Sequence, residues 1–176
     1  MFEEKCLKEE KIFSGDFLTL KKDTVELIDG QTATREIIVN DDAAAVVALD
    51  EENNIVLVKQ YRYALKREVL EIPAGKVEKG EDFLNAAKRE LVEETGYESN
   101  NWQSLDYFFS ALFSTQKTHL FLAQNCKKTK ELNLDEGEFL TVIKKPFKLA
   151  LEDVLNGKIK DSKTIVAIFK ANTLIN

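Results

Sequence analysis

The sequence contains no long apolar run and few cysteine, proline, glycine or histidine residues. No apolar stretch approaches the roughly 20 residues that a membrane-spanning helix needs, so no membrane partner is expected. Only two prolines and seven glycines interrupt the 176 residues, and long disordered linkers are therefore not expected either. These shortages argue against membrane-spanning and disordered classes and favour an ordinary folded chain.

The two cysteines, Cys6 and Cys126, are far apart in the sequence and do not have the spacing of metal ligands. They are interpreted as free thiols of a reducing compartment. The N-terminal stretch MFEEKCLKEEK is charged throughout and lacks an apolar run, so no signal peptide is expected. Together these features predict a cytoplasmic protein.

Basic residues are also in short supply, with 25 Lys and Arg against 31 Asp and Glu and a formal net charge of -6. Nucleic-acid binding needs a basic face, so no nucleic-acid partner is expected. The acidity suits a protein that handles anions through a bound divalent cation, although solubility explains it equally well. Hydrophobic residues make up 44% of the chain, enough for one ordinary domain with a small appended element.

Apolar residues in alternating or short continuous runs predict strands along much of the chain. Residues 11–39 show the alternation, and Asp29-Gly30 supplies a hairpin turn signal. Strands are predicted within residues 11–39, including 34–39, and at 43–49, 54–61, 69–72, 102–109, 119–123 and 139–143.

The pattern changes to helical spacing over residues 82–95, where Leu84, Ala87 and Leu91 recur and Gly96 then provides a C-terminal stop. Two further helices are predicted at residues 148–155 and 162–171. Strands and helices do not alternate along the chain. This order predicts an α+β fold in which helices sandwich a mixed β-sheet, with an N-terminal antiparallel strand element.

Glu90, Glu93 and Glu94 are spaced so that their carboxylates project from one face of the predicted helix, within reach of a common point. Like charges at this spacing repel, and a hard cation such as Mg²⁺ or Mn²⁺ removes the conflict. Arg89 lies between the acidic and apolar faces, where it can hold the acids in place. A turn-rich loop is predicted just before the helix and can direct the carbonyl of Ala74 toward the metal. The alternative interpretation is an exposed helix with solvated charges.

The acidic helix is part of a longer motif. From Gly75 to Gly96 the sequence reads glycine, five residues, glutamate, seven residues and then Arg-Glu-Leu-x-Glu-Glu-x-Gly. This pattern resembles the Nudix box, from which Tyr97 is a mild departure because an aliphatic residue is usual there. Residues 60–81 and the run GKIKDSKTIVAI at 157–168 are similar to the ADP-ribose pyrophosphatase branch of the Nudix superfamily.

The resemblance implies a Nudix fold and Mg²⁺-dependent hydrolysis of the diphosphate linkage of a nucleoside diphosphate sugar. ADP-ribose is the favoured substrate, with AMP and ribose 5-phosphate as products. The implied metal ligands are the carbonyl of Ala74 together with Glu90, Glu93 and Glu94. The implied catalytic residues are Arg89, Glu93, Glu94 and a general base.

Relatives of this branch often take the general base from a glutamate in a loop after the box. The corresponding loop is expected at residues 126–137, and Glu136 is our choice within it. Glu131 and Asp135 in the loop, and Glu138 at its edge, are the alternatives. A solvated surface acid is the competing interpretation for each of them.

Arg62 and Arg35 are the implied substrate-binding residues, and a surface charge on a strand is the alternative for each. Residues 1–40 are expected to form an N-terminal β element, which similar proteins use to build a domain-swapped homodimer. Residues 41–176 are then expected to form the Nudix hydrolase domain.

One segment departs from the branch. A Ser-Pro-Gly segment followed by an acid is usual there, whereas this chain has Ser110-Ala111-Leu112 and then Gln116 and Lys117. The departure leaves the base and sugar of the substrate open. GDP-mannose or a dinucleotide is an alternative substrate, and a non-catalytic sensor of nucleotide sugars is the alternative from another functional class.

Overall fold

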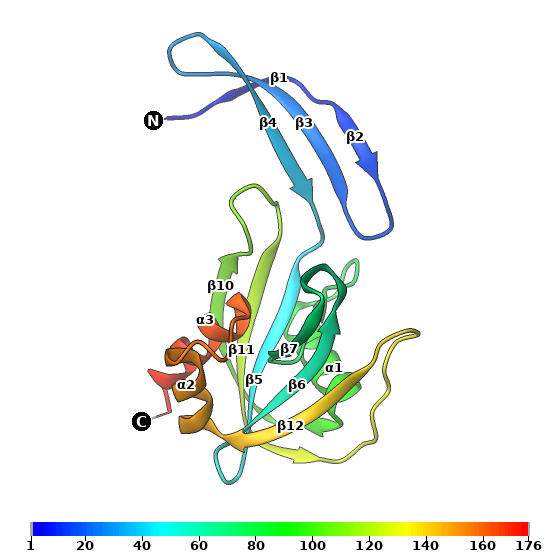
Figure 1. Ribbon diagram of the computed structural model, residues 1–176, viewed down its shortest axis with the longest axis vertical. Coiled ribbons are helices and arrows are strands. Elements are labelled where there is room, and N and C mark those ends of the chain that lie inside the picture. The colour runs from blue at the N-terminus through cyan, green and yellow to red at the C-terminus, as the bar shows by residue number, and fades with distance from the viewer. Residues whose placement is uncertain (1, 176) are drawn as a thin grey trace. The chain divides into compact units, whose positions relative to one another are not determined.

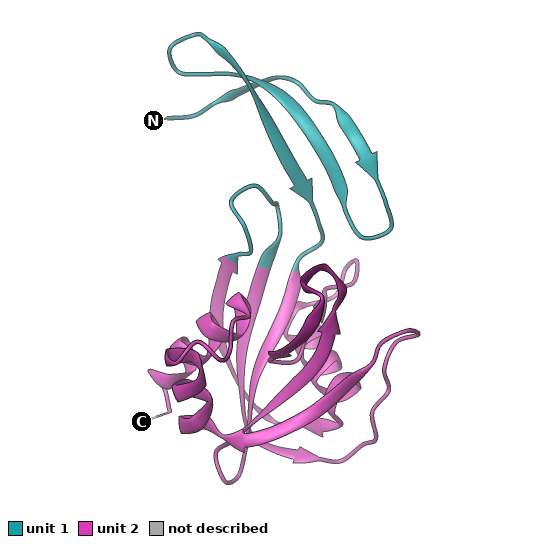
Figure 2. Ribbon diagram, in the orientation of Figure 1, with its two compact units in different colours: residues 1–42, 109–117 teal, residues 43–108, 118–176 magenta. Residues whose placement is uncertain are grey.

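The computed structural model describes residues 2–175, whose helices and strands are drawn in Figure 1. The chain divides into two units, which Figure 2 colours separately. The first unit contains Met1–Asp42 and Phe109–Lys117, and the second contains Ala43–Phe108 and Thr118–Asn176. Within the described residues, no helix is both long enough and apolar enough to cross a membrane.

An antiparallel sheet makes up most of the first unit. Its strands are β1 (Lys5–Lys8), β2 (Lys11–Ser14), β3 (Thr19–Glu26) and β4 (Thr32–Val39). β3 pairs with each of the other three strands. Gly30 has a φ of 81° in the turn between β3 and β4, which confirms the hairpin predicted at Asp29-Gly30. β1 was not predicted, because its short KCLK sequence is exposed throughout and has no apolar face.

The second unit is built on a mixed sheet whose long strands run in the order β10-β11-β5-β6-β12. These strands are β5 (Ala43–Asp50), β6 (Asn54–Arg62), β10 (Asn101–Phe109), β11 (Lys117–Lys128) and β12 (Leu140–Pro146). β11 and β5 are parallel, whereas β6 is antiparallel to both β5 and β12. The short strands β7 (Arg67–Glu71), β8 (Ala74–Lys76) and β9 (Tyr97–Glu98) pair with β6, β5 and β11 respectively. A 3-10 turn, η1 (Tyr63–Leu65), joins β6 to β7.

Helices cover both faces of this sheet: α1 (Phe83–Thr95), α2 (Phe147–Leu155) and α3 (Ser162–Asn172). Because side chains alternate along a strand, β5 contributes to two apolar clusters. Val47 and Leu49 pack in one cluster with Ile168 of α3, and Val46 packs in the other with Leu91 of α1. The predicted mixed sheet between helices is confirmed.

Both ends of α1 are fixed by local contacts, and the C-terminal stop predicted at Gly96 is confirmed. The Asp82 side chain accepts hydrogen bonds from the backbone N–H groups of Leu84 and Asn85, which caps the N-terminus. Gly96 ends the helix with a φ of 73°, and a Cβ there would lie 2.1 Å from the carbonyl oxygen of Lys130. The acidic segment is thereby fixed at a defined position over the sheet.

Two predicted loops are partly wrong. The turn-rich loop expected before α1 contains β8, since Ala74, Gly75 and Lys76 pair antiparallel with residues 43–45 of β5. The loop expected at residues 126–137 begins later, because β11 continues to Lys128 and pairs with β9. Both errors concern backbone pairing with distant strands, for which the local side chains carry little signal.

Candidate metal and substrate site

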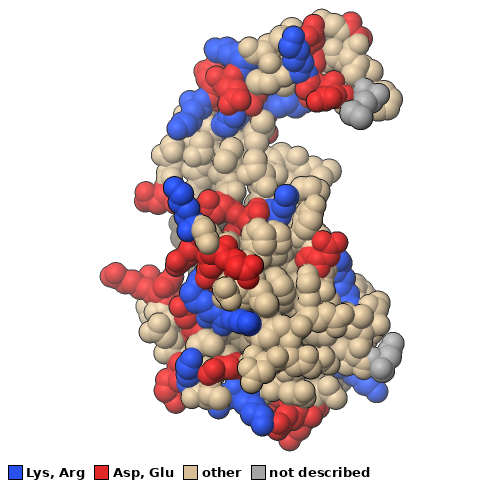
Figure 3. Space-filling view, turned by 180° about the vertical axis from the view of Figure 1, so that it is seen from behind, with Lys and Arg blue, Asp and Glu red and all other residues tan. Residues whose placement is uncertain are grey.

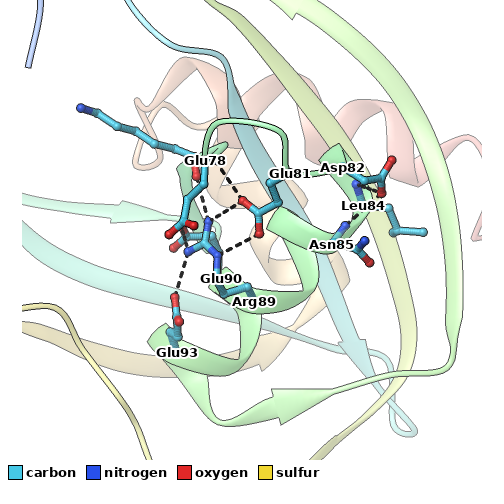
Figure 4. Close-up of polar contacts among 9 residues, drawn as sticks. Glu78, Glu81, Asp82, Leu84, Asn85, Arg89, Glu90 and Glu93 are labelled. Atoms are coloured by element: carbon cyan, nitrogen blue, oxygen red, sulfur yellow. Dashed lines mark hydrogen bonds and ion pairs between the residues drawn. The ribbon is translucent and has the colours of Figure 1, made fainter.

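Arg89 connects the elements around the acidic face of α1 (Figure 4). Its Nε and Nη2 donate to both oxygens of Glu81 at 3.0 Å, and Nη2 also donates to the carbonyl of Lys76 at 2.9 Å. Its Nη1 donates to Glu90 at 2.7 Å and to Glu93 at 3.0 Å. The pKa of Arg89 is raised, chiefly by its hydrogen bonds to Glu81 and further by those to Glu90 and Glu93. One fixed cation thus orients three carboxylates and ties the helix to β8 and the preceding loop.

Glu90 lies against Gly75 of β8. A Cβ at Gly75 would stand 2.0 Å from Oε1 of Glu90, so only glycine leaves room for this carboxylate. Burial raises the pKa of Glu90 despite the hydrogen bond from Arg89, and the negative charges of Glu93 and Glu138 add to the rise.

Glu94 is the most deeply buried acid on this face, with 2% of its surface exposed. Its Oε2 accepts a hydrogen bond of 3.0 Å from the backbone N–H of Ala74. Burial, reinforced by the charges of Glu138 and Glu90, raises the pKa of Glu94 to about 8. A buried carboxylate whose pKa is raised in this way stores unfavourable energy that a nearby cation relieves.

The carboxylates share one side of α1 but do not meet at one point. Within the described residues, the ligand atoms of Glu90, Glu93 and Glu94 do not all lie within 4.8 Å of one another. The expected convergence on a common point is therefore not found here. Arg89 holds Glu90 and Glu93 while the N–H of Ala74 holds Glu94, and these contacts compensate the like charges.

The donor chemistry nevertheless fits a hard divalent cation. Carboxylate oxygens are the ligands that Mg²⁺ prefers, and the raised pKa values of Glu90 and Glu94 mark two carboxylates that a cation would stabilise in the charged form. Glu93 keeps 30% of its side chain exposed and is held by Arg89. Glu90 and Glu94 are accordingly the side chains best placed to hold a metal.

A second polar cluster lies close to these acids. Glu71 on β7 is 2% exposed and accepts two hydrogen bonds of 2.7 Å from Nε and Nη2 of Arg62. Lys163, in the first turn of α3, also contacts Glu71 and lies 3.1 Å from Asp161. Burial opposes ionisation of Glu71, but Arg62 and Lys163 bring its pKa below the usual value. The charge of Glu94 contributes to the raised pKa of Arg62, so the two clusters interact.

A pocket of about 470 Å³ opens beside this cluster. Four basic residues line it, namely Arg62, Arg67, Lys160 and Lys163. Of these, only Arg62 was predicted as a site residue. Glu71 and Lys163 were missed, although both lie in the segments that carry the family resemblance.

Two predicted residues are not brought to this site by the described contacts. Arg35 belongs to the first unit, where its Nε donates to Glu4 at 2.8 Å. Glu136 is exposed in the segment that follows β11. Glu138, two residues further on, is partly buried, and its charge raises the pKa of both Glu90 and Glu94. Glu138 is therefore the acid of this segment that is coupled to the cluster.

Comparison with family models gives two matches along the chain. Residues 39–167 match the NUDIX domain, and residues 4–38 match the nucleoside diphosphate sugar hydrolase N-terminal domain. The two matches together span nearly the whole sequence.

Individual proteins are similar over the same length. A methanol dehydrogenase activator of Bacillus methanolicus is 45% identical, covering 96% of this chain and 92% of the relative. An ADP-ribose pyrophosphatase of Bacillus subtilis (strain 168) is 40% identical, covering 94% and 91% respectively. A crystal structure of an ADP compounds hydrolase superposes with a TM-score of 0.87 at 21% identity, covering 98% of this chain and 94% of that one. The last likeness concerns the fold alone.

Proposed function

This chain belongs to the NUDIX domain family of hydrolases that act on phosphorus-containing anhydrides, and from that premise we propose that it cleaves the diphosphate linkage of a nucleoside diphosphate sugar. ADP-ribose is the favoured substrate, and the products are AMP and ribose 5-phosphate. The observation that carries the proposal is the adjacency of two clusters. Buried Glu94, whose pKa is raised, interacts electrostatically with Arg62 and Lys163 of the basic pocket, and partly buried Glu90 lies on the same side of α1.

The proposed metal ligands are Glu90, Glu94, Glu93 and the carbonyl of Ala74, with Mg²⁺ as the cation and Mn²⁺ as a substitute. A bound cation at this place would neutralise phosphate charge and lower the pKa of a bound water. The chain's own contribution is orientation. Arg89 fixes Glu90 and Glu93, and the backbone of β8 fixes Glu94, so that little reorganisation remains when substrate binds.

A proton must leave the attacking water, and the segment after β11 supplies the proposed general base. Glu136 is the sequence-based candidate. Glu138 is the stronger one in the structure, because its charge acts on Glu90 and Glu94. Comparing Glu136→Gln with Glu138→Gln separates the two, since only the true base should lower kcat without changing the KM for substrate.

The substrate's anionic groups are proposed to lie in the basic pocket beside β7 and α3. Arg62 is held in one orientation by two hydrogen bonds to Glu71 and keeps 43% of its side chain exposed for contact with a phosphate. Arg35 of the first unit is retained as a second substrate-binding candidate on the strength of the resemblance alone.

Residues 1–40 are proposed to form a dimer-forming element ahead of the hydrolase domain at 41–176. The first unit exposes an unusual number of large apolar side chains: Phe2, Leu7, Ile12, Phe13, Phe17 and Ile28. Apolar surface of this extent is normally covered, and a second copy of the chain would do so. Light scattering of the full chain should then give the mass of a homodimer, and a monomer at micromolar concentration would contradict the proposal.

The remaining partner assignments are also proposals. On the face drawn in Figure 3, acidic and basic side chains are interleaved, and no broad basic area is visible among the described residues. This arrangement supports the absence of a nucleic-acid partner. Cys6 and Cys126 are both free thiols, which is the state that the cytoplasm maintains.

The experiment that tests the function is a panel of nucleoside diphosphate sugars and dinucleotides incubated with Mg²⁺ and assayed for released monophosphate. ADP-ribose should be cleaved fastest. Preference for GDP-mannose or a dinucleotide would select the alternative substrates, and binding without turnover would select the sensor. Glu94→Gln should abolish release, while Glu152→Gln, an exposed acid on α2, serves as the matched control.

A second candidate function is activation of an alcohol dehydrogenase. It is favoured by the 45% identity to the methanol dehydrogenase activator over 96% of this chain. A methanol dehydrogenase assayed with and without this protein tests it. If the wild type activates the dehydrogenase and Glu94→Gln does not, both functions depend on the same site. If the wild type does not activate the dehydrogenase, hydrolysis remains the single proposed function.

A further inference from the structure

A bulge in β1 brings three potential metal ligands together in the first unit. Cys6 pairs with Val25 and Lys8 pairs with Thr24, so Leu7 is an extra residue in the ladder. In a regular strand, Cys6 and Glu9 would point to opposite faces because they are three residues apart. The extra residue puts both on the face of β3 that carries Asp23 and Val25.

The resulting cluster consists of Cys6, Glu9 and Asp23, whose ligand atoms all lie within 4.8 Å of one another. Around a tetrahedral Zn²⁺, ligand atoms are separated by roughly 3.4–3.6 Å, as follows from its bond lengths. Binding of a metal would draw the three ligand atoms closer together, and the side chains of Cys6 and Glu9 that would move are exposed.

Asp23 gives an independent sign of a ligand. Its side chain is 9% exposed, and its Oδ1 is buried without a hydrogen-bond partner among the described residues. Leaving a carboxylate oxygen buried and unsatisfied is costly, and such atoms are rare in native proteins. A cation bound by the Asp23 carboxylate would offset this cost.

The surrounding charges are compatible with a dication. Lys21 Nζ lies 2.7 Å from Glu9 Oε2 and 3.5 Å from Asp23 Oδ2, so it pairs with two members of the cluster. Its flexible stem allows the ammonium group to move outward. Arg35, which is opposite Asp23 on β4, is already paired with Glu4. With the thiol of Cys6 ionised, the three ligands and Lys21 carry a net charge of about -2, which one divalent ion balances.

We propose that Cys6, Glu9 and Asp23 form a second metal site, separate from the acids of α1, for a borderline divalent cation of the zinc class. Thiolate and carboxylate ligands together favour Zn²⁺ over Mg²⁺, and a water completes the tetrahedron. Binding releases the thiol proton of Cys6 to solvent, and no bond other than S–H is broken. The bound ion would link Glu9, which follows β1, to Asp23 on β3.

The test follows the reactivity of Cys6 in the full-length protein with a disulfide reagent such as DTNB, with and without Zn²⁺. Cys126 serves as an internal blank, because it is 2% exposed and burial raises its pKa to about 11. Zn²⁺ should slow modification of Cys6 by roughly tenfold or more, since the thiolate becomes a metal ligand. Co²⁺ should show a sulfur-to-metal absorption band in the same titration.

Two carboxylate variants distinguish a metal site that uses all three ligands from metal binding by the thiol of Cys6 alone. Glu9→Gln and Asp23→Asn should lose the protection, whereas Glu10→Gln should keep it. Glu10 is the matched control, because it is exposed and paired with Lys8 as Glu9 is with Lys21. Equal protection in all four proteins, or none in the wild type, would overturn the proposal. Circular dichroism checks that each variant is folded. If Asp23→Asn does not fold, Glu9→Gln still tests the proposal, because Glu9 is exposed and its substitution should leave the fold intact.

Discussion

Glu94 should make the stability of the metal-free protein depend on pH in an unusual direction. Its pKa rises from 4.5 to about 8 on folding, chiefly through burial. A carboxyl whose pKa is raised stabilises the fold only while it is protonated. Its contribution is complete below pH 4.5 and is lost as the pH rises toward 8.

The size of the effect follows from the shift. Each pKa unit is worth about 1.4 kcal/mol, so the change at Glu94 corresponds to at most about 5 kcal/mol. Glu94→Gln cannot ionise, and its amide oxygen can still accept the hydrogen bond from the N–H of Ala74. In the presence of EDTA, the variant should therefore be more stable than the wild type at pH 8, by several kcal/mol.

Urea unfolding at pH 5, 6.5 and 8, with EDTA and then with Mg²⁺, measures this difference. Mg²⁺ should raise the free energy of unfolding of the wild type at pH 8, because a cation stabilises the ionised carboxylate. The free energy of unfolding of Glu94→Gln should not change with Mg²⁺. Glu152→Gln should follow the wild type under all conditions. If Glu94→Gln and the wild type show the same dependence of stability on pH, ionisation of Glu94 does not destabilise the fold. That result would contradict the predicted effect of burial on Glu94.

Three further changes test other parts of the site. Gly75→Ala places a Cβ 2.0 Å from Oε1 of Glu90, and it should lower kcat by roughly 10- to 100-fold in a substrate-saturated assay. Lys163→Met leaves buried Glu71 with a single cationic partner; urea unfolding should show a loss of about 2–4 kcal/mol, and the KM should rise. Glu138→Gln removes a negative charge that acts on Glu90 and Glu94, so the electrostatic attraction of the site for a cation weakens and Mn²⁺ affinity measured by calorimetry at pH 7 should fall.

The sequence predicted α1 almost completely, because its signals are local. The apolar spacing of Leu84, Ala87 and Leu91 and the stop at Gly96 act within a few residues of one another. The role of Arg89 in holding the acids could be predicted for the same reason, since Glu93 lies one helical turn away.

What the sequence could not predict depends on contacts between distant segments. The pairing of β8 with β5 and the contact of Glu71 with Lys163 join residues far apart in the chain. The choice between Glu136 and Glu138 depends on how one loop folds back toward α1, which no local pattern specifies. The bulge at Leu7 likewise arises from pairing with β3 and reverses the face that Glu9 would otherwise occupy.

The proposed function depends on the acids of α1, above all buried Glu94, bringing a divalent cation to a diphosphate. The most direct measurement is AMP release from ADP-ribose with Mg²⁺, compared between the wild type and Glu94→Gln. The wild type should release AMP, and the variant should lose roughly 100-fold or more of this activity at unchanged secondary structure. Undiminished release by Glu94→Gln would contradict the proposed function.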